Sequence, residues 1–341
     1  MKKITCAILA IMISLVMLSG CGASAREGWS SELCEAADGI MKSQRKAPES
    51  NKHGIIVMRS GFFDDTRKVE LYLVDPKTGK AELFAEFTWG MDQAIIGPVG
   101  FYGNLRDAFD KNYSRMAATA YIGGLSHAGW MTQDGIFSDA TEALGLECTN
   151  DESGYTDYRA YGFSEGYFYY AEWVIDYVSS ELTLYRVPAD DLRAEVVDEV
   201  TTDDPYMYFW ENIYNSTQTW SQTVQREMQP SMVIDSRYVL SDYGMNLMAL
   251  GSVSGDSSFV ITTPEQAISV FEDDEICWNP TLSPDNKKIC YLRRFRNDDS
   301  ISLCILSLKT GESEVVDTND LLSSILDDAG ESIVYTVLGW Y

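Results

Sequence analysis

The sequence predicts an all-β fold in which a unit of about four short strands is repeated along the chain. From Gly54 onward, short runs rich in β-branched and aromatic residues follow one another, and turn residues separate them. Amphipathic patterns with the period of a helix are scarce over the same region. Short strands joined by tight turns pair most simply as antiparallel sheets.

The first twenty residues have the pattern of a cleavable export signal. Lys2 and Lys3 precede an apolar run from Ile4 to Leu18, which is short for a membrane span of ~20 residues. The run ends in Leu-Ser-Gly before Cys21, and these four residues resemble the bacterial lipobox. The resemblance implies lipid on Cys21 and an extracytoplasmic protein anchored to the bacterial membrane. An ordinary secretory peptide and an uncleaved apolar helix remain as alternatives.

The chain is expected to have three parts. Residues 1–20 are the signal peptide, and residues 21–53 are a polar tether that begins with the lipidated cysteine. One short helix is expected in the tether, near Ser31 to Lys46. Residues 54–341 are expected to form the β domain.

The repeated unit is clearest between residues 282 and 316. Leu282 to Leu292 predicts a strand, a tight turn and a second strand, and Ser302 to Leu308 predicts a third strand. The turn Lys309-Thr310-Gly311 then leads into a fourth strand, Glu314 to Val316. Proline presets φ in such turns, Asp or Asn bonds the nearby backbone, and Gly or Asn accepts a positive φ. Similar units recur around acidic turn positions, which are Asp110, Glu165, Asp242, Asp285 and Asp328.

Several expected strands are apolar at successive positions, as in Ile55 to Met58 and Leu303 to Leu306. Such strands need cover on both faces. The blades of a β-propeller provide it, and the crossover helices that a parallel sheet requires are missing. The spacing of the units favours six blades and is compatible with five or seven. Residues 54–84 are expected to form three strands, with a hairpin turn at Pro76 to Gly79. We expect the strands near 333–341 to complete the sheet that these strands begin.

The residues Leu282-Ser283-Pro284-Asp285-Asn286-Lys287-Lys288-Ile289 resemble the TolB-like propeller repeat, whose usual turn is Ser-Pro-Asp-Gly-Lys. The match is close in this unit, fair around 163–170, and weak at 110, 242 and 328. The resemblance implies a propeller, and such propellers often serve as interaction platforms.

Composition argues against a nucleic-acid partner. The chain has 26 Lys and Arg against 52 Asp and Glu, a net charge of −26. A polyanion repels phosphates, and the one basic cluster, Arg293 to Arg296, is expected to be a solvated strand end. Besides Cys6 and Cys21, the cysteines form an odd and irregularly spaced set, which predicts free thiols. Cys290 and Cys304 lie in apolar runs and are expected to be buried, although a bridge between them stays open.

Candidate sites are few. Only His53 and His127 exist, and neither has a metal or triad partner at an informative spacing. Gly124 to Gly129 superficially resembles a nucleophile elbow but is expected to be a surface loop. Pairs of acidic residues are expected to be solvated turns, so neither a metal nor a cofactor is predicted. Four aromatic residues could bind a sugar or a peptide, or could be ordinary blade core; they are Tyr206, Tyr208, Trp210 and Trp220.

The sequence therefore favours a binding or scaffolding module, without catalytic activity, for an envelope protein or glycan. One alternative is a solute-binding lipoprotein of a transporter, but such proteins alternate strands and helices. The other is an accessory to a hydrolase. Related propellers gate peptidases, which need a hydrolase domain of about 250 further residues for which this chain has no room.

Overall fold

The computed structural model describes the part of the chain that carries the predicted strands. The described residues are 31, 35, 38, 52–63, 65–99, 105–151, 154–164, 166–176, 180–195, 198–199, 228–234, 237–242, 260–262, 267–268, 275–295, 298, 300–318, 321–322 and 333–341. From residue 52 onward the described chain consists mainly of β-strands, as expected. In the predicted tether, Ser31, Glu35 and Asp38 are helical. Two compact units are present, and one of them, made of residues 46–202, 241–259 and 271–341, holds most of the strands.

Sheets A and B of this unit each have four antiparallel strands. Three strands of sheet A are the ones expected between residues 54 and 84, and the third of them continues to Gly90. Sheet A has the order β21-β1-β2-β3, with strands Ile333–Trp340, Ile55–Phe63, Thr66–Val74 and Ala81–Gly90. Sheet B has the order β4-β5-β6-β7, with strands Ile95–Ile96, Arg115–Ile122, Leu125–Thr132 and Phe137–Asp139. The short helices η2 (Leu105–Ala108) and α3 (Ala140–Ala143) lie before β5 and after β7.

Three further sheets repeat this arrangement. Sheet C has the order β12-β11-β10-β9-β8, with strands Asp198–Glu199, Ser180–Pro188, Tyr167–Asp176, Gly154–Ser164 and Thr149–Asp151. Sheet E has the order β17-β18-β19-β20, with strands Glu275–Leu282, Lys288–Phe295, Ser302–Ser307 and Ser313–Val316. Sheet D has the order β13-β14-β15-β16, with strands Met228–Ile234, Arg237–Asp242, Val260–Thr262 and Ala267–Ile268. Most of sheet D belongs to the second compact unit, which includes residues 203–240 and 260–270.

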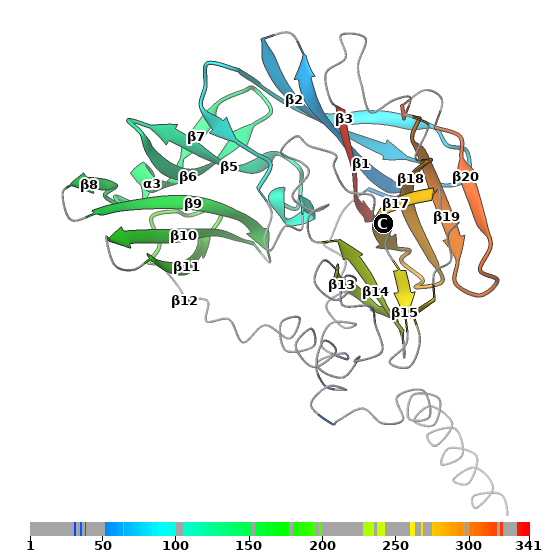
Figure 1. Cartoon of the computed structure of the whole chain (residues 1–341). Coiled ribbons are helices and arrows are strands. Elements are labelled where there is room, and N and C mark those ends of the chain that lie inside the picture. Colours follow the sequence, from blue (N-terminus) through cyan, green and yellow to red (C-terminus); the bar gives the residue numbers. More distant parts are fainter. Residues whose placement is uncertain are drawn as a thin grey trace, which may run out of the picture. The chain divides into compact units, whose positions relative to one another are not determined.

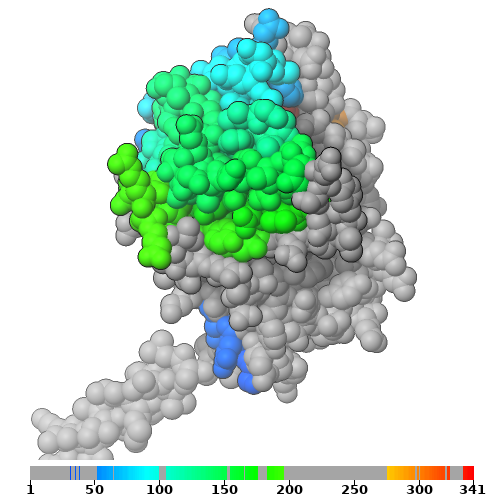
Figure 2. All heavy atoms as spheres, turned by 90° about the vertical axis from the view of Figure 1, so that its left-hand side faces the viewer, coloured from blue at the N-terminus to red at the C-terminus, as the bar shows by residue number. Residues whose placement is uncertain are grey.

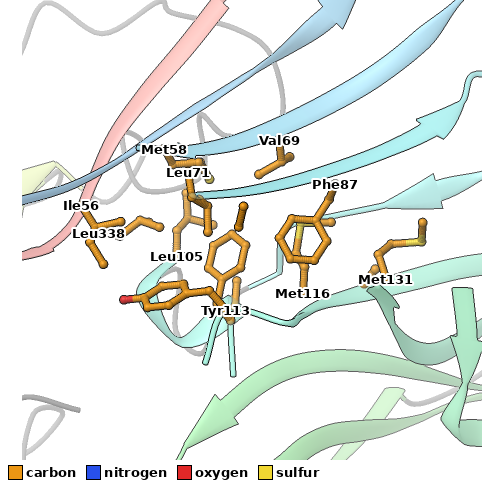
Figure 3. Close-up of a cluster of buried hydrophobic side chains, with 14 of the residues drawn as sticks. Ile56, Met58, Val69, Leu71, Phe87, Leu105, Tyr113, Met116, Met131 and Leu338 are labelled. Atoms are coloured by element: carbon orange, nitrogen blue, oxygen red, sulfur yellow. The ribbon is translucent and has the colours of Figure 1, made fainter. Parts of the chain in front are cut away.

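Sheets E, A, B and C pack in that order, and each neighbouring pair shares a hydrophobic core (Figure 1). The core between sheets A and B includes Met58, Phe87 and Met116, together with Leu105 from η2 (Figure 3). Atoms of sheets B and C form one continuous surface in Figure 2, coloured from cyan to green. The four sheets therefore form one framework in which sheets A and B are covered on both faces.

The burial of β1 explains why its sequence is apolar at successive positions. Ile55 and Val57 point to the core shared with sheet E, whereas Ile56 and Met58 point to the core shared with sheet B. All four side chains are fully buried. Since neighbouring residues of a strand face opposite sides, a continuous apolar run needs a sheet on each side.

The first and last described strands of the chain lie side by side, which confirms the expected pairing of the two ends. β21 is antiparallel to β1, with Gly61 opposite Ile333 and Ile55 opposite Trp340. The Gly54 amide donates to the Tyr341 carbonyl at 2.8 Å, and the Tyr341 amide donates back to the Gly54 carbonyl at 2.9 Å. Residues about 280 positions apart in sequence thus complete one sheet.

The turn between β17 and β18 has the predicted chemistry. The Ser283 hydroxyl accepts hydrogen bonds from the amides of Lys287 and Lys288, at 3.2 and 2.9 Å, and Asp285 accepts from the Ser283 hydroxyl at 2.8 Å. Asn286 adopts a positive φ of 56°. Asparagine tolerates this left-handed conformation better than most residues, which explains its position in the turn.

The turn before β5 corrects the predicted alignment of the units. Asp110 bonds the amides four and five residues later, those of Ser114 and Arg115, as Ser283 does in its own turn. Asp110 is therefore equivalent to Ser283 and not to Asp285. A carboxylate replaces the hydroxyl as acceptor, and both residues can bond nearby backbone amides.

Two other predictions are wrong. Leu125 to Gly129 belong to strand β6 and not to a surface loop, because only Gly123 and Gly124 form the turn, with φ of 62° and 87°. Asp242 is the last residue of strand β14 and not a turn residue. The expected turn residues Glu165 and Asp328 lie outside the described residues.

The cysteines of sheet E are free, as expected. Cys277, Cys290 and Cys304 are buried thiols, and Cys148 is half-buried. Cys290 lies opposite Ile305 and Cys304 lies opposite Tyr291, so the two thiols of these neighbouring strands point to opposite faces. A one-residue offset on a strand reverses the face, so the bridge that the sequence left open does not form.

Candidate interaction surface

The site residues proposed from the sequence lie outside the described residues. These are the lipid acceptor Cys21 and the aromatic residues Tyr206, Tyr208, Trp210 and Trp220. None of the helices in the described part of the chain is long and apolar enough to cross a membrane.

His127 has a partner that its sequence spacing did not reveal. Its Nδ1 lies 2.8 Å from Oδ2 of Asp139, and both side chains are mostly buried. The other carboxylate oxygen of Asp139 accepts the amide of Glu142 and caps α3. The pair therefore links β6 to β7 and α3. Sequence reasoning missed it because the two residues meet only through the hairpin register, twelve positions apart.

Potential nucleophiles near this pair are directed elsewhere. Ser126 is fully buried, and the Cys148 thiol lies 3.6 Å from the Ser126 carbonyl, where Cys148 packs on the core between sheets B and C. Burial raises the pKa of the Cys148 thiol to about 11, and the nearby carboxylates of Asp139 and Asp157 add to the shift. A thiol with this pKa is almost entirely protonated at neutral pH and is a poor nucleophile.

The described residues contain no group of three His, Cys, Asp or Glu side chains that could hold a metal ion. One polar residue with several partners is Arg115, which joins sheets B and C. Its guanidinium donates to Asp110 at 3.0 Å, to the Ala189 carbonyl at 2.7 Å and to Asp190 at 2.8 Å. It also lies over the rings of Trp130 and Phe163. These contacts hold two sheets together, so Arg115 is structural.

Exposed apolar side chains lie near the ends of the hairpins of sheets A and B. Met91, Tyr121 and Ile122 are 56, 44 and 46% exposed. The loop after β3 connects them, because the Met91 amide donates to Asp65 in the β1–β2 turn and the Tyr121 amide donates to Ala94. We call this region, together with Phe62 and Phe63 at the end of β1, the hairpin-tip surface.

Cationic side chains lie over the rings of the hairpin-tip surface. The Arg67 guanidinium is centred 5.1 Å from the ring of Phe62, and Arg59 lies 5.1 Å from the ring of Phe63. The Lys68 ammonium is 5.9 Å from the ring of Phe63. Burial lowers the pKa of Arg67, but an arginine remains charged at any physiological pH. The surface thus combines exposed apolar groups with charges held beside aromatic rings.

The same position carries apolar residues in the other sheets. β10 ends with Val174 and Ile175 before Asp176, and β18 ends with Phe295. Val174 and Phe295 are 39 and 37% exposed. In all four sheets of the framework, therefore, the last three residues of the strand equivalent to β1 include at least one apolar residue.

No family model and no curated protein matches the chain. Among solved structures, TolB from Acinetobacter baumannii is 9% identical with a TM-score of 0.27, and the match covers 76% of this chain and 52% of that protein. An oligogalacturonate lyase from Vibrio parahaemolyticus is 12% identical with a TM-score of 0.27, covering 78 and 73%. An oligogalacturonate lyase in complex with manganese is 10% identical with a TM-score of 0.28, covering 77 and 74%.

The chain thus spans about half the length of that TolB. These likenesses, all with TM-scores below 0.5, establish neither a fold nor an activity for this chain. The described part of the chain offers a rigid framework of sheets and an exposed apolar surface at its hairpin tips. Exposed apolar groups that gather in one place are typical of contact surfaces.

Proposed function

We propose that the chain is a membrane-anchored, extracytoplasmic lipoprotein whose six-bladed propeller is a binding or scaffolding module for an envelope protein or glycan. The observation that carries the proposal is the framework itself. Four sheets share three cores, and the first and last strands pair, so the loops at both ends of the sheets are displayed from a rigid support. Binding residues are commonly placed on loops that a rigid scaffold positions.

The proposed location at a membrane rests on the sequence. The residues before Cys21 resemble a lipobox, and one thioether-linked diacylglyceryl group with a further acyl chain would hold the chain durably at a membrane, since each buried methylene contributes about 0.8 kcal/mol.

We also propose that the module has no catalytic activity of its own. In the framework, the His127–Asp139 pair links secondary structure elements, Ser126 is buried and the thiol of Cys148 is protonated at neutral pH. These groups stabilise the sheets instead of converging on a reacting atom. A nucleophile and its base need to lie within hydrogen-bonding reach of each other.

The anchoring is tested by labelling the expressed chain with radioactive palmitate and fractionating the cells. We expect label in the membrane fraction and none in a Cys21→Ala variant. A soluble, unlabelled chain would refute the anchor. The binding role is tested by photo-crosslinking in the native envelope from residues placed in the exposed loops, such as Asp190 and Asp285. A reproducible crosslink that an exposed site on the outer strand β20, Val315, does not give would support the binding role; identical patterns from all three sites would refute it.

A further inference from the structure

The outer edge of sheet A is formed by β3, which is the longest edge strand in the described framework. β3 has ten residues, whereas the equivalent edge strands β7, β20 and β12 have three, four and two. No described strand pairs with the free side of β3. In the described part of the chain, residues 81–87 make no backbone hydrogen bond outside sheet A. An edge strand with free amides and carbonyls can accept a further strand.

A row of side chains across sheet A ends at this edge. Tyr335 of β21 lies opposite Arg59 of β1. Arg59 lies opposite Glu70 of β2, which in turn lies opposite Glu86 of β3. Arg59 donates to Glu70 at 3.2 Å, whereas Glu86 accepts only the Thr88 hydroxyl, at 3.2 Å, among the described residues. Like charges directly opposite each other destabilise a sheet, so a second cation beside Glu86 would relieve the repulsion between the two carboxylates.

The neighbouring cations of the described chain are directed elsewhere. Lys68 of β2 is on the same face of the sheet as Glu86, but its ammonium lies 5.9 Å from the ring of Phe63 and forms no ion pair with Glu86. Lys52 lies 4.9 Å from the ring of Phe84, which packs on the core between sheets A and B and so belongs to the other face. The position beside Glu86, on the free side of β3, is therefore open to a cation from another molecule.

We propose that the outer edge of β3 binds a short, extended segment of a partner protein as an additional strand, with a lysine or arginine of that segment opposite Glu86. The proposal rests on the proposed binding role and names the chemistry of the partner. Backbone hydrogen bonds would supply affinity, and the carboxylates of Glu70 and Glu86 would select the basic residue. Leu83, which is 45% exposed on the same face, would contact an apolar residue of the segment.

The same edge disfavours a second copy of this chain. β3 contains Glu82 and Glu86 and neither lysine nor arginine. Two β3 strands side by side would therefore gather like charges at one edge. The pairing with β2 shifts at Phe84, and Gly135 of the β6–β7 turn lies near the Thr88 carbonyl. A bulge bends and twists a strand, so the free length suits a short segment better than the long flat edge of another sheet.

The test measures the affinity of a dye-labelled peptide, Thr-Val-Thr-Arg-Thr-Val-Thr with blocked ends, by fluorescence anisotropy at physiological ionic strength. We expect saturable binding that weakens about three- to fivefold when glutamine replaces the arginine. In a Glu86→Gln protein the two peptides should bind equally, since the charge that distinguishes them has lost its partner. Glu312→Gln removes the same charge from the exposed β19–β20 turn and should preserve the difference between the peptides.

Two N-methylated forms of the peptide test the added strand. Alternate amides of a strand point to the same side, so methyl groups on one alternate set should abolish binding, whereas methyl groups on the other set should leave it unchanged. Equal effects of the two sets would overturn the proposal, because they would show attraction between charges without strand pairing. A preference for arginine that survives in Glu86→Gln would also overturn it.

Thermal melting of the Glu86→Gln protein separates recognition from folding. We expect this protein to melt no lower than the native chain, because the change removes a charge opposite Glu70. A lower melting temperature would assign Glu86 to the fold and overturn its role in recognition. Failure of the peptide to bind would overturn the β3 site alone. Crosslinking from the exposed loops tests the general binding role separately, so the two failures are distinguishable.

Discussion

At the scale of the residue, Arg115 shows how one side chain holds two sheets together. Its guanidinium bonds a mostly buried carboxylate in the turn before its own strand and a backbone carbonyl next to sheet C, while two aromatic rings cover it. Arg115→Ala would leave Asp110 without its cation. We expect the free energy of unfolding in urea to fall by about 2 to 4 kcal/mol.

Arg115→Lys keeps the charge but cannot bond three acceptors from one planar group, so we expect an intermediate loss. Arg193→Ala is the matched control, since this arginine is exposed beyond the same edge of sheet C, and it should change stability by less than about 0.5 kcal/mol. An Arg115→Ala protein as stable as the control would contradict the role of Arg115 as a link between sheets.

Cys304 gives stability a dependence on alkaline pH. Burial raises the pKa of its thiol from an ordinary value of 9.0 to about 11. The folded state favours the neutral thiol, so this contribution is complete below pH 9 and is lost between pH 9 and 11. One pKa unit corresponds to about 1.4 kcal/mol, which makes the loss about 2 to 3 kcal/mol.

Urea unfolding of the native chain and of Cys304→Ala at pH 8, 9.5 and 11 checks this prediction. The variant loses some packing at every pH, so it should start less stable and then decline less steeply than the native chain. Tyrosines titrate in the same range in both proteins and cancel in the comparison. Parallel declines would show that the Cys304 thiol does not contribute.

The roles of individual turn residues were predictable from the sequence, but the alignment of one repeated unit with another was not. The role of Ser283 and the positive φ of Asn286 follow from the known chemistry of tight turns. Asp110 was aligned with the wrong residue because an acidic residue can occupy either the first acceptor position or the third position of the turn. Hydrogen bonds distinguish the two, and sequence similarity alone does not.

At the scale of the element, the hairpins of sheets A and E offer a matched comparison. Gly79 follows β2 and Gly311 follows β19, and both have a positive φ, 70° and 73°. Their amides donate to Asp75 and Ser307, each at 2.9 Å. The turns differ in surroundings, because a Cβ atom on Gly79 would collide with the carbonyl of Asp317, the residue that follows β20 of sheet E, whereas Gly311 has open space around it.

Gly311→Ala should therefore cost only the strain of a left-handed alanine, about 1 to 2 kcal/mol. Gly79→Ala should cost at least 1 kcal/mol more, since the hairpin must also move away from sheet E. Thermal or urea unfolding of the two variants measures the difference. Equal losses would mean that the β2–β3 turn does not pack on sheet E.

Element boundaries followed from the sequence where both the strand pattern and the turn were distinctive. The four strands of sheet E and the three that begin at Ile55 were predicted from apolar runs and turn residues. β6 was missed in part because Gly124 to Gly129 contains two glycines and a histidine, which suggested a loop. Pairing with β5 overrides these weak local preferences, since Ala120 lies opposite His127.

At the scale of the whole molecule, the sequence predicted a repeated sheet and the pairing of the chain's ends, but not the surface that faces outward. Apolar residues at strand ends resemble core residues in sequence. Only the position of Tyr121 and Ile122 beside an open glycine turn distinguishes them. A sequence pattern reports which residues are apolar, whereas exposure depends on whether another sheet covers them.

The last prediction concerns the pairing of β21 with β1. Deleting residues 333–341 removes four buried apolar side chains, which are Ile333, Tyr335, Val337 and Leu338. Each large apolar side chain contributes about 1.5 to 3 kcal/mol when fully buried, so the combined loss approaches the whole stability of a domain, about 5 to 15 kcal/mol. The deletion also exposes the edge of β1, whose side chains are apolar on both faces, to pairing with other chains.

We therefore expect the truncated chain to unfold or aggregate, whereas Val337→Ala should only lower the melting temperature by a few degrees. Thermal melts of the three proteins decide between this result and a dispensable tail. A truncated chain that melts within about two degrees of the full one, a difference under about 1 kcal/mol, would show that β21 does not complete the fold.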